Sequence, residues 1–177
     1  QGTPYLAMEY LMGETPALIQ RRVASRPSSL AVHDHTGFAS KFLLDACEGL
    51  PAAHELKGSD GKPLELTHRD ISPQNLYVTY DGGVRVVDFG VARARSRMHH
   101  TKTGSIKGKF SYMAPEQIRG ETIDRRVDIW ALGVTLWETL CLRRLFRRES
   151  EGSTILAVIE GRIPPVSDFN NAVPDEL

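Results

Sequence analysis

The sequence lacks a charge excess of either sign, because 22 lysines and arginines balance 22 aspartates and glutamates. Without a net field the chain has no general attraction for nucleic acid or for an anionic membrane, and we expect neither as a partner. A long apolar run is also missing. The most hydrophobic stretch, residues 129–142, is too short to cross a bilayer. We therefore expect no membrane contact by this segment.

Cysteine is scarce as well, and Cys47 and Cys141 each lie within an apolar helical pattern. Two buried free thiols in a reducing compartment explain this usage better than one distant disulfide. We therefore expect a cytoplasmic protein. The length of 177 residues, with 41% hydrophobic and 25% charged residues, is typical of one globular domain.

Hydrophobic periodicity predicts an α+β domain that is mainly helical. Apolar residues recur at helical spacing in four segments: 16–23, 38–56, 128–141 and 153–160. Pro51 lies inside the second segment and is expected to kink it, because proline removes a backbone donor and crowds the preceding turn. The polar residues 26–37 are expected to form an irregular connection.

The strand patterns are short. Residues 5–11 have the composition of a buried strand, and further strands are predicted at 64–67, 76–80 and 84–87. Asp81-Gly82-Gly83 joins the last two and is typical of a tight hairpin, since glycine readily adopts positive φ angles. Residues 91–111 are polar and basic without periodicity, and a loop of that length inside a compact domain is usually functional.

Residues suited to phosphoryl transfer are concentrated between positions 67 and 90. His-Arg-Asp at 68–70 is followed by Asn75, by the predicted hairpin and by Asp-Phe-Gly at 88–90. A carboxylate such as Asp70 can orient a hydroxyl nucleophile and accept its proton, and Asn75 and Asp88 offer the oxygen ligands that magnesium requires. The hairpin is expected to bring these two ligands side by side.

These motifs, together with Ala-Pro-Glu at 114–116 and Asp-Ile-Trp at 128–130, resemble the eukaryotic-like protein kinase family of serine/threonine type, in a bacterial variant. By this resemblance the chain is a partial kinase domain, mainly the helical C-terminal lobe with short β-hairpins at the catalytic loop. Four parts are assigned: a hinge at 5–13, a catalytic loop at 68–75, an activation segment at 88–116 and a central helix at about 128–141.

The resemblance also implies ATP and Mg²⁺ as cofactors and a protein serine or threonine as phosphate acceptor. Asp70 is then the catalytic base, Asn75 and Asp88 are metal ligands, and the backbone of Met8, Glu9 and Leu11 binds adenine. Asp128 is expected to hold the backbone of the catalytic loop. The remaining motif residues are expected to be structural: His68, Phe89, Gly90 and Glu116.

Control by phosphorylation is implied by Arg69, which directly precedes the catalytic aspartate. A phosphate brings nearly two negative charges and can order a basic loop against an arginine. Thr101 and Thr103 have the position of the twin phosphothreonines of bacterial kinases, and Ser105 is the alternative site.

The chain departs from the family pattern outside and inside the active site. It contains no G-x-G-x-x-G and no Val-Ala-x-Lys, so we expect an N-terminal lobe outside this chain and no activity from the chain alone. Serine/threonine kinases carry lysine where this chain has Ser72, and threonine where it has Lys109. We expect Lys109 to reach Asp70 and replace the missing lysine, with Ser72 in a small hydrogen-bonding role.

Two other functions fit parts of the pattern. A pseudokinase that acts as a docking module is suggested by Ser72 and opposed by the presence of Asp70, Asn75 and Asp88. A small-molecule phosphotransferase of the aminoglycoside kinase type shares those three residues but lacks an Ala-Pro-Glu segment. Pro73 favours serine/threonine over tyrosine specificity, because tyrosine kinases of the family usually carry Ala-Arg combinations there.

Overall fold

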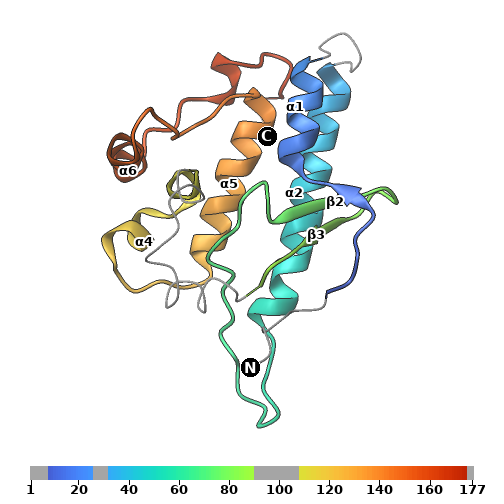
Figure 1. The fold of residues 1–177 in the computed structure, drawn as a ribbon, viewed down its shortest axis with the longest axis vertical. Helices are drawn as coiled ribbons and strands as arrows, with labels where there is room; N and C mark the ends of the chain where they lie inside the picture. Colours follow the sequence, from blue (N-terminus) through green and yellow to red (C-terminus); the bar gives the residue numbers. More distant parts are fainter. Residues whose placement is uncertain (1–7, 26–31, 90–107, 175–177) are drawn as a thin grey trace, which may run out of the picture.

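The computed structural model describes residues 8–25, 32–89 and 108–174. Within these ranges the chain forms five α-helices, two short 3-10 helices and one three-stranded antiparallel sheet (Figure 1). The helices are α1 Pro16–Ser25, α2 Val32–His54, α4 Pro115–Arg119, α5 Arg126–Cys141 and α6 Glu151–Glu160, with the 3-10 helices η1 Lys109–Tyr112 and η2 Val166–Asp168. The prediction of a mainly helical α+β chain is confirmed.

The start of α2 was predicted too late. The helix already includes residues 32–37, which we expected to be an irregular connection. This turn contains Thr36 and Gly37, which have poor helix propensity, and the apolar spacing that signals a helix begins only at Phe38. The helix also continues through Pro51 and ends at His54, so the proline lies in its last turn.

The segment that follows residue 107 is more ordered than its lack of periodicity suggested. It contains η1 and then α4, a helix of only five residues that is too short to show a periodic pattern. Pro115 occupies the first turn of α4, and Gly120 ends the helix with φ +68°, a conformation that a glycine adopts without strain.

The sheet consists of β1 Gly13–Glu14, β2 Leu76–Thr79 and β3 Val84–Val86, in the order β1-β2-β3. The predicted hairpin joins β2 to β3, and Leu76 pairs with Val86. Glycine is required in β1, because a Cβ on Gly13 would lie 2.2 Å from the carbonyl oxygen of Val78.

Two predicted strands are wrong. Residues 64–67 form no strand, and Leu64 and Leu66 are 48% and 38% exposed. Residues 8–11, the described part of the predicted strand at 5–11, are also irregular, and Tyr10 is 87% exposed. In both segments the apolar alternation resembled a strand, but among the described residues no neighbouring strand pairs with them. Pattern alone does not supply a pairing partner.

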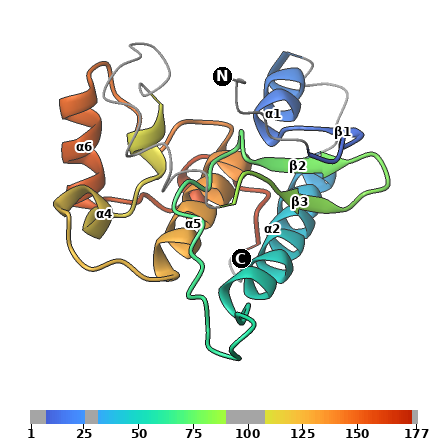
Figure 2. The same cartoon turned by 60° about the horizontal axis from the view of Figure 1, so that its bottom comes forward.

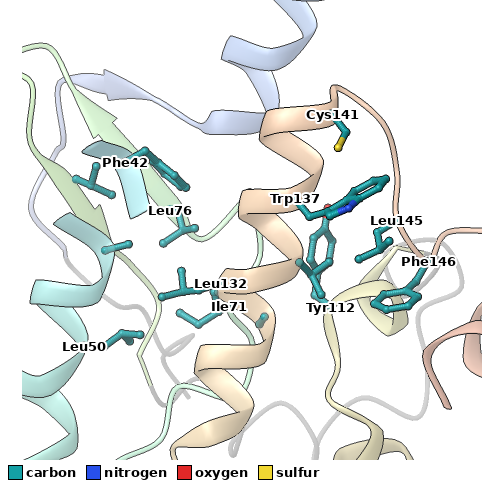
Figure 3. Packing of buried hydrophobic residues seen from close by; sticks show 14 of the residues in the cluster. Phe42, Leu50, Ile71, Leu76, Tyr112, Leu132, Trp137, Cys141, Leu145 and Phe146 are labelled. Atoms are coloured by element: carbon teal, nitrogen blue, oxygen red, sulfur yellow. The ribbon is translucent and has the colours of Figure 1, made fainter. Parts of the chain in front are cut away.

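Helix α5 stands at the centre of the molecule, between α2 with the sheet on one side and α4 with α6 on the other (Figures 1 and 2). Figure 3 shows the two packed groups that it separates. Leu132 faces Phe42, Leu76 and Ile71, whereas Trp137 lies on the other side with a group formed by Tyr112, Leu145 and Phe146.

The two cysteines are free, as predicted, with Cys141 buried and Cys47 partly buried. Among the described residues, no helix has the length and apolar character needed to span a membrane.

Candidate active site

The predicted catalytic loop is fastened to the central helix by one buried carboxylate. Asp128, in the first turn of α5, is fully buried. Its Oδ2 accepts the backbone N–H of His68 at 2.9 Å, and its Oδ1 accepts the backbone N–H of Arg69 at 2.8 Å. This is the anchoring contact that the sequence led us to expect. His54, at the end of α2, contacts the same carboxylate at 2.8 Å, and no motif pointed to it.

The hairpin places Asn75 and Asp88 next to each other. Asn75 directly precedes β2, Asp88 follows β3 after one residue, and the backbone N–H of Val87 donates to the Asn75 carbonyl at 2.9 Å. The buried His68 ring contacts the end of the hairpin that follows β3, where its Nε2 donates to the carbonyl of Val87 at 2.8 Å. Phe89 packs edge-on against the same ring, with the centroids 4.7 Å apart.

Asp70 lies in the loop between His68 and Asn75, and its side chain is 17% exposed. The backbone N–H of Asp70 donates to His68 Nδ1 at 3.3 Å, and its carbonyl accepts the Asn75 side-chain amide at 2.7 Å. The Asn75 amide nitrogen is thus occupied within the loop, which leaves Oδ1 for another ligand. Asp88 has φ +64°, a strained conformation for a residue with a side chain, and strain of this kind often marks functional sites.

Lys109 approaches Asp70 from the activation segment. It is the first residue of η1, and its Nζ forms an ion pair with Asp70 Oδ2 across 39 positions of the sequence. Ser72, which is 5% exposed, and Tyr112 line the same small hollow as these two residues.

Gln117 ties the catalytic loop to the start of α4. Its Oε1 accepts the backbone N–H of Ala114 at 2.9 Å, and its Nε2 donates to the carbonyl of Arg69 at 3.2 Å. Arg69 has φ +66°, its backbone is held on both sides and its side chain is exposed. No local sequence pattern predicted this hydrogen bond, because it joins residues 48 positions apart.

A second polar network holds η1 against α5. Glu138 is 1% exposed, and its Oε2 accepts the Tyr112 hydroxyl and Arg144 Nη1, each at 2.7 Å. Burial and the neighbouring Glu138 carboxylate raise the pKa of Tyr112 far above its ordinary value. Sequence reasoning missed Glu138 and Arg144, since neither belongs to a motif that we considered.

The predicted hinge residues lie along one exposed edge. Met8 is 67% exposed, Glu9 is exposed and Leu11 is partly buried. Among the described residues, no backbone hydrogen bond uses residues 8–11, whereas the carbonyl of Met12 accepts the N–H of Tyr80 at 3.0 Å. These backbone donors and acceptors therefore have no partner within the part of the chain that the structure describes.

The other predicted site residues do not meet the catalytic loop or lie outside the described residues. Glu116 is partly exposed in α4 and forms no ion pair with another described residue. Gly90, Thr101, Thr103 and Ser105 lie outside the ranges that the structure describes. Within those ranges no three His, Cys, Asp or Glu residues gather as a metal site.

Comparison with known proteins agrees with this geometry. The protein-family profile "Protein kinase domain" matches residues 1–175. "Tyrosine-protein kinase MasK" of Myxococcus xanthus is 44% identical over 177 residues, which are all of this chain and 27% of that protein. "Serine/threonine-protein kinase PrkC" of Bacillus subtilis is 32% identical over 173 residues, 98% of this chain and 24% of that protein.

"Serine/threonine-protein kinase PknB" of Mycolicibacterium smegmatis is 31% identical over 175 residues, 97% of this chain and 25% of that protein. The chain thus spans about a quarter of the length of these bacterial relatives. The family profile covers nearly every residue of the chain. The chain belongs to the protein kinase family.

Proposed function

We propose that the protein transfers the γ-phosphate of ATP to serine or threonine hydroxyls of other proteins. The observation that carries this proposal is the assembly of Asp70, Asn75 and Asp88 by a single anchored loop and hairpin. The loop is fastened to the buried Asp128, and the hairpin sets the two oxygen ligands beside it. Phosphoryl transfer depends mainly on positioning and charge stabilisation, which such an anchored frame provides.

The residues present fit magnesium and ATP. Mg²⁺ is usually held by one or two side-chain oxygens, with water and phosphate completing its shell, so a larger acidic cluster is not required. Asn75 Oδ1 and the Asp88 carboxylate would hold the ion, and the backbone of Met8, Glu9 and Leu11, which has no hydrogen-bond partner among the described residues, would hold the adenine. When bound, these groups supply the phosphoryl donor and the positive charge that balances it.

The residues of this chain act directly on the acceptor hydroxyl. Asp70, mostly withdrawn from solvent, orients the hydroxyl and accepts its proton. The hydrogen bond from Asn75 to the Asp70 carbonyl keeps the base and the metal ligand in a fixed relation. Asp128 does not touch the substrate and acts by holding the loop.

Serine/threonine specificity is supported by Pro73 and by the similarity to PrkC and PknB, both named serine/threonine-protein kinases. The name of MasK favours tyrosine as a second candidate acceptor. Both chemistries use the same base and metal ligands, so the choice concerns the acceptor alone. The phosphorylated amino acid must be identified directly.

The test uses the full-length protein with ATP, Mg²⁺ and a mixed protein substrate, followed by phosphoamino acid analysis. We expect phosphoserine and phosphothreonine. We expect Asp70→Asn to lower the rate of transfer by about 10²- to 10⁴-fold, with a measurable residual rate, and Asp88→Asn to abolish measurable transfer. Asp60→Asn is the matched control, because Asp60 is an exposed carboxylate on a distant loop. Phosphotyrosine alone would establish the second candidate. ATP binding without any transfer by the wild-type protein would instead favour a docking pseudokinase.

This chain contains neither a glycine-rich loop nor Val-Ala-x-Lys, so we infer that the lobe that binds the ATP phosphates lies outside it. The reaction then needs both lobes, and the isolated chain should be inactive. The free cysteines and the requirement for ATP agree with a cytoplasmic location. Turnover by the purified chain equal to that of the full-length protein would contradict this division.

Phosphorylation of Thr101 and Thr103, or of Ser105, is the proposed control. Arg69 supports this role, because its backbone is fixed at the catalytic loop while its guanidinium remains exposed to receive a phosphate. Replacing all three hydroxyl residues by alanine should strongly reduce the activity of the full-length protein. Unchanged activity in this triple variant would exclude control at these positions.

A further inference from the structure

We propose that Lys109 is a catalytic residue, and that the cation beside the base of this kinase is therefore supplied by the activation segment and not by the catalytic loop. The inference rests on the proposed function and assigns a role that the motifs for base, metal and nucleotide leave open. Its starting observation is the ion pair between Lys109 Nζ and Asp70 Oδ2.

The position of Lys109 distinguishes it from the surface lysines of the described chain. Its side chain is 38% exposed, whereas the Lys41 and Lys62 side chains are 62% and 83% exposed. Lys109 also faces a carboxylate that is itself largely withdrawn from water. An ion pair at a half-buried site is screened less than one on the open surface, so its charge acts more strongly on its neighbours.

The catalytic loop makes room for this cation. Ser72, two residues after Asp70, is 5% exposed and lines the hollow that also contains Asp70 and Lys109. A short hydroxyl side chain at this position leaves the space next to the carboxylate open to a residue from another segment. Ser72 and Lys109 thus line one small site from two different segments of the chain.

Contacts with two other elements hold the segment that carries Lys109. Three residues further on, Tyr112 binds the buried Glu138 of α5, so the end of η1 cannot move without breaking a buried hydrogen bond. Gln117 joins the residues after η1 to Arg69, the neighbour of Asp70. Contacts on two sides therefore fix the relation between the segment that carries the lysine and the loop that carries the base.

The chemistry assigned to Lys109 is electrostatic. The acceptor oxygen forms a bond to the γ-phosphorus while the bond from that phosphorus to the bridging oxygen breaks, and the electron pair leaves with ADP. The hydroxyl proton passes to Asp70. Lys109 keeps its own protons throughout, holds the carboxylate towards the acceptor, and stabilises negative charge on the transferred group as a fixed point charge.

The first test compares Lys109→Met with Lys41→Met in the full-length protein. Lys41 is the matched control, because it also forms an ion pair with an aspartate but lies on the exposed side of α2. We expect Lys109→Met to lower kcat by on the order of 10²-fold with little change in KM for ATP, as for loss of one preorganised charge. Lys109→Arg, which keeps the charge, should retain more activity than Lys109→Met. A Lys109→Met enzyme within about threefold of wild-type kcat would overturn the inference.

The second test asks whether Lys109 acts together with Asp70. We expect Asp70→Asn combined with Lys109→Met to be about as inactive as Asp70→Asn alone, because residues that act as a unit are not additive. Independent, multiplicative losses would contradict the pairing. Ser72→Lys added to Lys109→Met should restore part of kcat, since it returns a cation to the same site from the catalytic loop. The melting temperature shows whether the double variant is folded. If it is folded and kcat does not recover, the idea that Lys109 replaces a cation of the catalytic loop is overturned.

A third test measures ligand binding, so it needs neither turnover nor a correctly folded rescue variant. The probes are ADP with Mg²⁺ alone and ADP with Mg²⁺ and aluminium fluoride, which imitates the group in transfer. Lys109→Met should leave ADP affinity within about twofold and weaken the aluminium fluoride complex by at least tenfold, since the charge matters mainly in the transition state. Equal effects on both complexes would overturn the catalytic role. A wild-type protein without any transfer activity would refute the proposed function instead.

Discussion

Glu138 and Arg144 form an ion pair 2.7 Å long in which the carboxylate is 1% exposed and the arginine side chain is 41% exposed. Tyr112 shares the carboxylate, and the backbone N–H of Leu145 donates to its other oxygen at 3.0 Å. The network joins η1 to α5 and therefore holds the segment that carries Lys109.

Removing the Arg144 cation should lower the free energy of unfolding more than removing an exposed surface arginine does. Arg144→Met leaves the Glu138 charge buried without its partner, and we expect a loss of about 3 kcal/mol, the lower end for a buried pair because Arg144 is partly exposed. Denaturant unfolding of the full-length protein measures it. Arg162→Met is the control, since that side chain is 88% exposed, and should change stability by less than about 0.5 kcal/mol. Equal effects of the two variants would show that the buried pair contributes nothing.

Tyr112 should make stability fall at alkaline pH. Burial first, and then the Glu138 carboxylate, raise the pKa of its hydroxyl in the folded protein. A raised pKa contributes stability fully below the ordinary tyrosine value, and this contribution is lost as pH rises above that value towards the folded one. Above about pH 10 the wild-type protein should therefore lose up to about 1.4 kcal/mol more per pH unit than Tyr112→Phe. Unfolding free energies at several pH values between 9 and 11 provide the comparison, and parallel curves would disprove the linkage.

Cys141 should react slowly with alkylating reagents. Burial raises the pKa of this thiol to about 11, although nearby Arg143 acts in the opposite direction. At pH 8 only about 0.1% of it is then thiolate, compared with about a quarter of an ordinary cysteine. We expect alkylation of Cys141 to be at least 100-fold slower in the folded protein than in the same protein unfolded in guanidinium, by mass spectrometry. Labelling at the unfolded rate would place the thiol at the surface.

The sequence predicted the parts of the site that are local. Asp70 and Asn75 lie within one loop, and the hairpin signal of Asp81-Gly82-Gly83 was enough to place Asp88 beside them. Such inferences succeed because short segments and turn chemistry determine the geometry. The strand predicted at 64–67 failed because a strand requires a partner that no local pattern reveals.

The residues that hold the site in place were not predictable in the same way. His54, Gln117 and Glu138 are 74, 48 and 26 positions away from the partners that give them a role. Each is an ordinary residue of its own helix when considered alone. Asp128 was predicted because a family motif contains it, and its physical role became visible only with the contacts to the loop.

Asp128→Ala should therefore affect stability and activity together. The substitution removes the acceptor for the backbone N–H groups of His68 and Arg69 and leaves them buried or partly buried without a partner. Two unsatisfied donors cost about 2–6 kcal/mol together. We expect a lower unfolding free energy and a kcat reduced by at least tenfold in any folded fraction, with Asp60→Ala as the exposed control. A stable, fully active Asp128→Ala enzyme would show that the loop needs no anchor.

Gln117 offers a sharper separation of positioning from stability. Gln117→Glu keeps an oxygen for the N–H of Ala114, which is the cap of α4, and loses the donor to the carbonyl of Arg69. The tie is partly exposed, so its loss should cost no more than about 1 kcal/mol of stability. Because a small displacement of catalytic groups lowers rates strongly, we expect kcat to fall by about tenfold or more while KM for ATP stays near the wild-type value. Arg119→Ala, on the exposed face of the same helix, should change neither quantity. If Gln117→Glu resembles Arg119→Ala in kcat, the link between α4 and the catalytic loop has no part in catalysis. If it lowers kcat, restoring the donor with Gln117→Lys should recover some of the loss, since an ammonium can again reach the Arg69 carbonyl.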